Sequence, residues 1–208
     1  MTRTTYLLAA AVIALGVMDA MATEEATYTV TTSEGAFEIR DYAPHVVAET
    51  LVEGTLEEAG NKAFNRLFRY ISGGNRSREK VAMTAPVSQQ PQGEKIAMTA
   101  PVAQQRVQEK WAVSFMMPAS STLETLPAPE DPQVALRQVP ARRVAAVRYS
   151  GAWSEKGYRR NLEKLESWMR AKGLAPAGDP VWARYNSPFS LWFLRRNEIL
   201  IPVATTAD

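Results

Sequence analysis

One pattern of structural elements occurs twice in this chain at a constant spacing, and this repeat restricts the fold more than any other feature. Residues 39–50 match residues 136–147 at an offset of 97 (136 − 39 = 97), and Gly54 matches Gly151 at the same offset. Each copy reads as a strand, a proline turn, a second strand, a glycine and a capped helix, and repeated units of this kind pack on one another. We therefore predict an α+β fold in which one antiparallel sheet carries two helices.

Both helices have recognisable boundaries in the sequence. Thr55 and Glu58 can form a capping box before the first helix, and Gly73 follows its last apolar residue. Ser154 can cap the second helix, and Gly173 ends it. The apolar residues of the first helix have the three-and-four spacing of one buried stripe: Leu56, Ala59, Ala63, Phe64, Leu67, Phe68 and Ile71.

A short phrase is repeated after the first helix. Residues 80–87 and 95–102 both read Lys-X-Ala-Met-Thr-Ala-Pro-Val, where X is Val or Ile. Each copy is a short apolar run closed by a proline, which cannot donate to a strand ladder, so we predict two paired strands at strand-end or edge positions. Met83 and Met98 either fill the core or make soft contacts with a flat aromatic or metal-bearing ligand.

The first 22 residues have the features of a secretory signal peptide. Arg3 precedes an apolar run at residues 6–18, and Ala-Met-Ala at 20–22 is a small-residue cleavage site. This run is shorter than the about 20 apolar residues that span a bilayer. We therefore expect a periplasmic or secreted protein with no membrane span, whose single mature domain at 23–208 contains internal repeats at about 28–117 and 133–203.

Composition excludes several kinds of chemistry. The chain has no cysteine, so it has no disulfide, no thiolate metal site and no cysteine nucleophile. The formal net charge is +2 and the arginines are scattered rather than arranged in one basic stripe, so we expect no nucleic-acid partner. The sequence has no zinc-protease, P-loop, nucleophile-elbow or dinucleotide-binding motif.

Three features remain as candidates for chemistry. His45, the single histidine, is either a surface residue or an iron ligand or general base. Glu198 follows two arginines and forms either an ion pair or a buried base. The aromatic loop at 189–194, beside Arg195 and Arg196, either packs on the sheet edge or holds a flat anionic ligand.

Five signatures, taken in order, resemble the SOUL heme-binding protein family. They are Ile-Arg-Asp-Tyr at 39–42, Tyr-Ile-Ser-Gly-Gly-Asn at 70–75, the Met-Thr-Ala-Pro-Val copies at 83–87 and 98–102, Tyr-Asn-Ser-Pro at 185–188 and Arg-Arg-Asn-Glu at 195–198. The resemblance covers about residues 28–203. It implies a pseudo-twofold distorted barrel of about eight antiparallel strands flanked by two helices, and reversible, non-catalytic binding of heme or another tetrapyrrole.

The resemblance also implies that the ligand binds in an apolar cleft on the first helix. In family members of the hydrophobic-cleft type, heme lies against the first helix, and the matching positions here are Asn61, Phe64, Phe68 and Arg69. The phenylalanines would flank the ring and the arginine would pair with a propionate. Another branch of the family has a histidine where this sequence has Asp41, and the histidine here, His45, lies four residues further on.

Two other functions are open at this point. A small-molecule hydrolase on the same scaffold would use Glu198 with Tyr185, and a ligand-free interaction module would use neither residue. Reversible tetrapyrrole binding is the leading hypothesis, because the resemblance covers nearly all of the expected mature chain.

Overall fold

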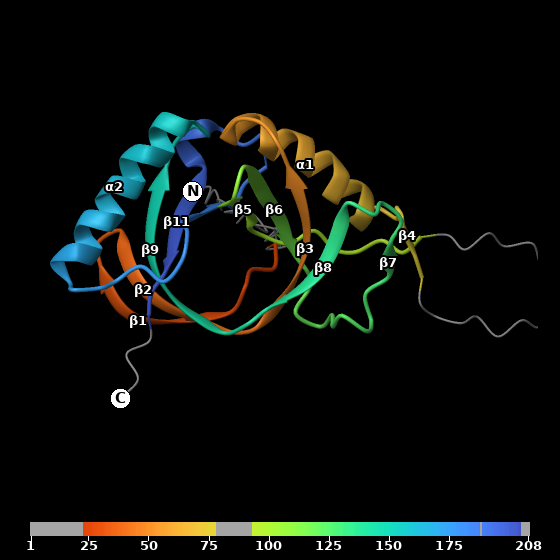
Figure 1. The fold of residues 1–208 in the computed structure, drawn as a ribbon, viewed down its shortest axis with the longest axis horizontal. Coiled ribbons are helices and arrows are strands. Elements are labelled where there is room, and N and C mark those ends of the chain that lie inside the picture. The colour runs from red at the N-terminus through yellow and green to blue at the C-terminus, as the bar shows by residue number, and fades with distance from the viewer. Residues whose placement is uncertain (1–22, 78–92, 188, 205–208) are drawn as a thin grey trace, which may run out of the picture.

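A single curled antiparallel sheet dominates the fold (Figure 1). The computed structural model describes residues 23–77, 93–187 and 189–204. Within these residues, nine strands pair in the order β1-β2-β9-β11-β10-β5-β6-β3-β8 and curve into a half-barrel. The strands are β1 (Tyr28–Glu34), β2 (Phe37–Tyr42), β3 (His45–Val52), β5 (Val102–Val107), β6 (Lys110–Met116), β8 (Val134–Val139), β9 (Arg142–Ser150), β10 (Val181–Arg184) and β11 (Arg196–Pro202). A separate two-stranded ribbon is formed by β4 (Asn75–Arg76) and β7 (Ala128–Pro129).

The strand order confirms the duplication. Outward from the central β10–β5 pair, the strands β10, β11, β9 and β2 correspond to β5, β6, β3 and β8. The predicted offset holds, since β8 begins 134 − 37 = 97 residues after β2 and β9 begins 142 − 45 = 97 residues after β3. The first strand of each repeat pairs with the other repeat, β2 with β9 and β8 with β3. The two repeats are therefore interlocked within one sheet.

Two helices lie on the outer side of the curled sheet (Figure 1). They are α1 (Leu56–Ile71) and α2 (Glu155–Ala171). The capping box of Thr55 and Glu58 is formed, and the Ser154 hydroxyl accepts a hydrogen bond from the Gly157 N–H. Such caps contribute about 1 kcal/mol each. The predicted starts of both helices are confirmed.

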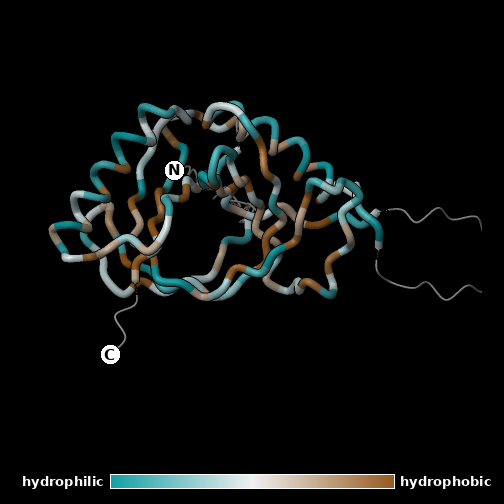
Figure 2. The backbone as a smooth tube through the Cα atoms, in the orientation of Figure 1, coloured by the Kyte–Doolittle hydropathy of each residue, from teal (hydrophilic) through white to brown (hydrophobic). Residues whose placement is uncertain are grey.

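The apolar core has three parts. One lies between α1 and the strands β3 and β6, around the fully buried Leu67 and Val113. A second lies between α2 and the strands β9 and β11, around Leu165 and Ile199, and a third lies inside the curl, around Val144. Figure 2 shows apolar positions recurring along the strands. The inner strands are apolar on both faces because the helices cover one face and the curl closes over the other.

The repeated Met-Thr-Ala-Pro-Val phrase gives a different result from the predicted strand pair. Residues 80–87 lie outside the described residues, and residues 95–101 form no ladder apart from an isolated bridge at Ala100. The strand begins only at Val102, and it pairs with β10 and β6. The preceding segment bonds to α1 instead, where the Ile96 N–H donates to the carbonyl of the last α1 residue at 2.8 Å. The strand prediction for 95–101 is therefore wrong, because these backbone groups are used outside the sheet.

The export prediction concerns residues 1–22, which lie outside the described residues. The described chain begins beside the sheet, where the Ala100 N–H donates to the Glu24 carbonyl at 2.8 Å. Across the described part of the chain, no helix combines the length and the apolar character needed to cross a bilayer.

Candidate functional site

Two phenylalanines form an aromatic surface on α1. Phe64 and Phe68 are four residues apart and so lie one turn apart on the same side of the helix. Their rings are stacked, with centroids 5.8 Å apart and planes within 10°. Phe64 is half-buried and meets Phe115 of β6 edge-on, whereas Phe68 is 45% exposed. The prediction of one buried stripe is wrong at Phe68, because the buried side of α1 extends from Leu67 toward Tyr70 and away from Phe68.

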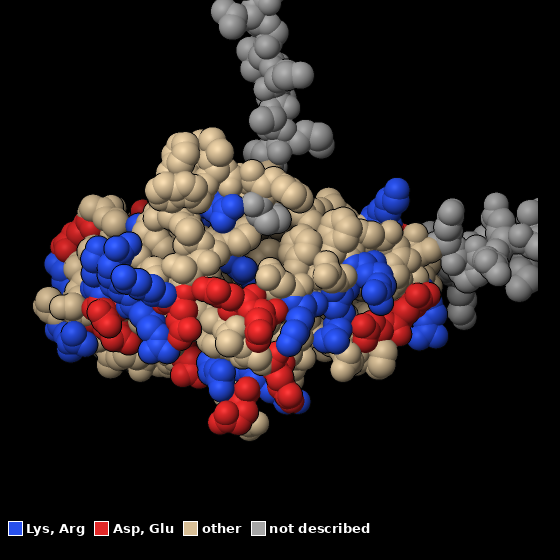
Figure 3. All heavy atoms as spheres, turned by 90° about the horizontal axis from the view of Figure 1, so that it is seen from above, with Lys and Arg blue, Asp and Glu red and all other residues tan. Residues whose placement is uncertain are grey.

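Polar side chains border this aromatic surface. Asn61 and Arg69 are both exposed. Among the described residues, the Arg69 guanidinium has no ion pair, whereas the neighbouring Arg66 is held by Asp131 at 3.3 Å and by Thr50 at 2.7 Å. A cavity of about 260 Å³ adjoins both arginines, but Glu130 and Asp131 also line it and neither phenylalanine does. Figure 3 shows acidic and basic side chains interleaved on the helix side, so an anion bound there depends on single arginines such as Arg69.

The described methionine of the repeated phrase reaches the surface. Met98 is 46% exposed and lies in the segment 95–101, which is hydrogen-bonded to the last residue of α1. From the same segment, Ile96 packs on the core cluster that Phe64 also contacts. Core filling is therefore the wrong interpretation for Met98, and Met83 lies outside the described residues.

His45 lies on the opposite face of the sheet from α1. Side chains alternate between faces along a strand, and Val46 and Ala48 pack under α1, so His45 faces the inside of the curl. There its Nδ1 lies 3.0 Å from a backbone carbonyl. Burial lowers the pKa of His45 below its ordinary value, the backbone bond opposes this change, and the charges of Arg142 and Arg137 add to it. The structure therefore does not bring His45 together with the residues of α1.

The α1 surface suits some parts of a heme group better than others. Phe64 and Phe68 supply a flat apolar wall, and Arg69 supplies a charge for a carboxylate. None of the four predicted helix residues is a usual iron ligand. No group of three His, Cys, Asp or Glu side chains in the described ranges is placed to hold a metal ion. The residues present therefore fit the ring and its propionates, without a strong ligand for the iron.

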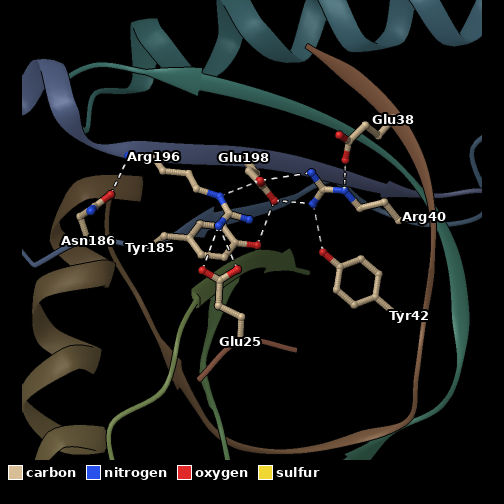
Figure 4. A network of polar contacts seen from close by, with 8 residues as sticks. All are labelled: Glu25, Glu38, Arg40, Tyr42, Tyr185, Asn186, Arg196 and Glu198. Atoms are coloured by element: carbon tan, nitrogen blue, oxygen red, sulfur yellow. Dashed lines mark hydrogen bonds and ion pairs between the residues drawn. The ribbon is translucent and has the colours of Figure 1, made fainter. Parts of the chain in front are cut away.

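A second polar centre lies inside the curl, around Glu198 (Figure 4). The Glu198 carboxylate is fully buried and accepts four hydrogen bonds. Two come from Arg40 at 2.6 and 3.2 Å, one from Arg196 Nε at 3.0 Å and one from the Tyr185 hydroxyl at 2.9 Å. Three further residues extend this network at its edges: Glu25, Glu38 and Tyr42.

This environment keeps Glu198 ionised. Burial by itself raises the pKa of the carboxyl, but the hydrogen bond and charge of Arg40, the charge of Arg196 and the Tyr185 hydrogen bond together hold the pKa below its ordinary value. Burial, and then the Glu198 charge, raise the pKa of Tyr185. A general base must reach the proton that it removes, and a fully buried carboxylate with four donors cannot. The ion-pair interpretation of Glu198 is confirmed, and the geometry does not support a hydrolase that uses Glu198 and Tyr185.

Arg40 is the main partner of Glu198, and this pairing was not predicted from the sequence. The two residues are 158 positions apart and meet because β2, β9 and β11 are neighbours in the sheet. A partial signal was present, since Arg40 lies in the Ile-Arg-Asp-Tyr signature and Glu198 in the Arg-Arg-Asn-Glu signature.

The fold and the surface of α1 together define a duplicated α+β half-barrel domain with an aromatic site on its first helix. The family model for the SOUL heme-binding protein matches residues 23–202, which is 202 − 22 = 180 of the 208 residues. The chain therefore belongs to the SOUL heme-binding protein family, as its signatures predicted. No curated protein matches the sequence.

Several solved structures share the fold at low sequence identity. The C-terminal domain of EcmrR has a TM-score of 0.53 and 12% identity, over 86% of this chain and 99% of that chain. A hydrolase from Listeria innocua has a TM-score of 0.54 and 11% identity, over 84% of this chain and 94% of that chain. EcmrR in a complex with DNA has a TM-score of 0.55 and 13% identity, over 80% of this chain and 56% of that chain. At these identities the likeness shows the fold alone.

Proposed function

We propose that this protein binds heme or another tetrapyrrole reversibly, without catalysis, on the outward surface of α1. Membership of the SOUL family supports the class of ligand. The observation that carries the choice of site is the stacked pair of Phe64 and Phe68, because Phe68 remains 45% exposed on a helix whose inner side is fully packed. Small-molecule sites combine apolar and aromatic side chains with a few polar groups, and on α1 the polar groups beside the phenylalanines are Asn61 and Arg69.

Each residue of the proposed site has a role that follows from its position. Phe64 and Phe68 form the wall on which the macrocycle stacks. Arg69 donates charge-assisted hydrogen bonds to a propionate, and the Asn61 amide donates to a second polar group of the ligand. Bound heme would supply the iron chemistry, and these residues hold and orient the ring.

The expected affinity is modest. Removing apolar surface from water contributes about 25 cal/mol per Å², but the entropy lost on association offsets much of this gain. Because α1 offers no strong iron ligand, we expect a dissociation constant of roughly 1 μM.

Hemin titration followed at the Soret band tests the proposal. Wild type should saturate at one hemin per chain, and Phe64→Ala with Phe68→Ala should weaken binding about tenfold or more. Val107→Ala is a matched control, because Val107 is 42% exposed on β5 and outside the site. Circular dichroism would verify that each variant is folded. Loss of binding in His45→Ala, with full binding in the double phenylalanine variant, would contradict the proposed site.

We also propose that the protein is exported to the periplasm or the medium. The support is in the sequence, where Arg3, the apolar run at 6–18 and the small residues at 20–22 have the order of a signal peptide. Mass spectrometry of the protein from its native host should find a chain that begins at Thr23. An intact Met1 would contradict this route of export.

A further inference from the structure

The loop at residues 189–194 carries five large apolar side chains that are all exposed to solvent. Their exposed fractions are 94% for Phe189, 58% for Leu191, 60% for Trp192, 51% for Phe193 and 66% for Leu194. A segment that lies flat on a protein covers some of its side chains, whereas here every large side chain is more than half exposed. Of the two interpretations of this loop, packing on the sheet edge is therefore wrong, and the loop projects from the surface.

The projecting loop is nevertheless held in one shape. The Leu194 N–H donates to the Leu191 carbonyl at 3.0 Å, and the short helix η1 (Trp192–Leu194) places the Trp192 and Phe193 rings edge to face, 5.6 Å apart. At the base, Arg195 Nε donates to the Ser190 carbonyl at 2.9 Å, and the Arg195 guanidinium lies 4.5 Å from the ring centre of Trp153. The apolar residues are thus presented by a fixed base, so little ordering is needed before they make contacts.

The N-terminal part of the chain enters the domain beside this loop. Arg196, two residues after the loop, binds both carboxylate oxygens of Glu25 at 2.9 Å. Glu25 is the third residue of the chain that would remain after cleavage before Thr23, so this ion pair holds the start of the mature chain beside the loop.

We propose that the loop at 189–194 inserts into the interface of a phospholipid bilayer and docks the domain on the membrane. Tryptophan and phenylalanine are favoured at the boundary between headgroups and acyl chains, and the loop has no charged residue to oppose insertion. A second copy of the protein is a less suitable partner, since stable interfaces use about 20–30 residues a side and this projection has six. This docking is separate from heme binding on α1 and does not depend on it.

Brominated phospholipids test the insertion directly. The full chain would be mixed with phosphatidylcholine–phosphatidylglycerol vesicles whose acyl chains carry bromine, and tryptophan quenching would be measured on the protein that floats with them. Wild type should be quenched more strongly than Trp192→Phe, because the change keeps the loop apolar and removes the reporter. This readout is local to the loop, so it does not respond to residues 6–18. Equal quenching of the two proteins would overturn the proposal.

A second experiment measures how much the loop contributes to binding. Replacing Phe189, Trp192 and Phe193 together by Ser should reduce partition into the vesicles about tenfold. The matched control is Val30→Ser with Leu51→Ser, which removes two exposed apolar side chains elsewhere and should leave partition unchanged. Unchanged partition in the triple variant would overturn the proposal.

Two further outcomes would assign the loop to other partners and also overturn the proposal. In sedimentation without lipid, a dimer that the triple variant disperses would show that the loop binds a second copy. In hemin titration, the triple variant should bind as wild type does. Loss of hemin binding without any change in vesicle partition would place the loop in the heme site instead.

Discussion

The two repeats share a backbone but differ in the charges that they place inside the curl. Arg40 on β2 and Arg137 on β8 are equivalent, since 137 − 40 = 97. Glu198 and Ala112 are equivalent too, because their partners on β9 and β3 are again 148 − 51 = 97 residues apart. Arg40 therefore binds a buried carboxylate, whereas Arg137 pairs with the partly exposed Glu49 at 2.6 Å. Of these two equivalent positions in the duplicated sheet, one therefore carries a buried ion pair and the other a partly exposed one.

The two helices differ on their outer sides. Leu67 of α1 and Leu165 of α2 are both fully buried and align at an offset of 165 − 67 = 98. At that offset, Phe68 of α1 corresponds to Glu166 of α2. The packing residues are thus similar in both repeats, while an exposed aromatic residue on α1 is replaced by a charged residue on α2. Packing is therefore common to the two halves, and binding is expected of the first half.

Separating the two repeats has the largest expected effect. Since β2 pairs with β9 and β8 pairs with β3, each isolated half loses a neighbour that only the other half supplies. Residues 28–117 and residues 133–203, expressed separately, should show no cooperative thermal unfolding, whereas the whole chain should. A cooperative melt from either fragment would show that the repeats are two independent units.

Removing the buried carboxylate is expected to have the next largest effect. Glu198→Gln removes the fully buried counter-charge of Arg40 and leaves it with the partly exposed Glu38, so the change should lower the free energy of unfolding by about 3–5 kcal/mol in urea titrations. The matched change on the other half, Glu49→Gln, breaks a partly exposed pair and should cost less than about 1 kcal/mol. If both variants lost a similar free energy of unfolding, the buried ion pair would contribute no more to stability than the partly exposed one, which would contradict this prediction.

One glycine in each helix allows the two helices to be compared at the level of single atoms, Gly60 in α1 and Gly157 in α2. A Cβ at Gly60 would lie 2.7 Å from Nη2 of Arg184, a buried residue whose pKa is lowered by burial to about 10. A Cβ at Gly157 would lie 3.1 Å from the Ser154 hydroxyl. Gly60→Ala should therefore destabilise the protein, because overpacking costs up to about 3 kcal/mol and the gain in helix propensity is about 1 kcal/mol.

Gly157→Ala serves as the control for this prediction. A gain of about 1 kcal/mol in helix propensity should offset the mild crowding at the cap, so that urea titration finds little change in stability. If Gly60→Ala were as stable as Gly157→Ala, the close packing of Arg184 against α1 would be wrong.

Local signals in the sequence predicted much of this fold. The capping box at Thr55 and the cap at Ser154 fixed the helix starts, and the repeat offset of 97 predicted the correspondence of β2 with β8 and of β3 with β9. These features depend on neighbouring residues or on a regular pattern, so they can be recognised without knowledge of the tertiary structure.

The parts that were not predicted depend on contacts between distant segments. The hydrogen bond between Arg40 and Glu198 depends on the order of the strands in the sheet. The orientation of His45 toward the inside of the curl depends on the register of β3. Helical spacing placed Phe68 in the buried stripe, but the border of that stripe depends on what packs against α1, and the sheet covers the side of Tyr70 rather than that of Phe68. Apolar composition likewise could not distinguish a loop packed on the sheet from the projecting loop at 189–194.

In the proposed site, ligand binds outside the sheet on α1 and not inside the curl beside His45. Ferric heme is paramagnetic, so it broadens the amide NMR signals of residues near it, and a spectrum of the labelled protein with added hemin locates the site. We expect broadening at Asn61, Phe64, Phe68 and Arg69, with the signals of β3 around His45 and of α2 around Glu166 preserved. Broadening centred on His45, with the α1 signals unchanged, would contradict the proposed site.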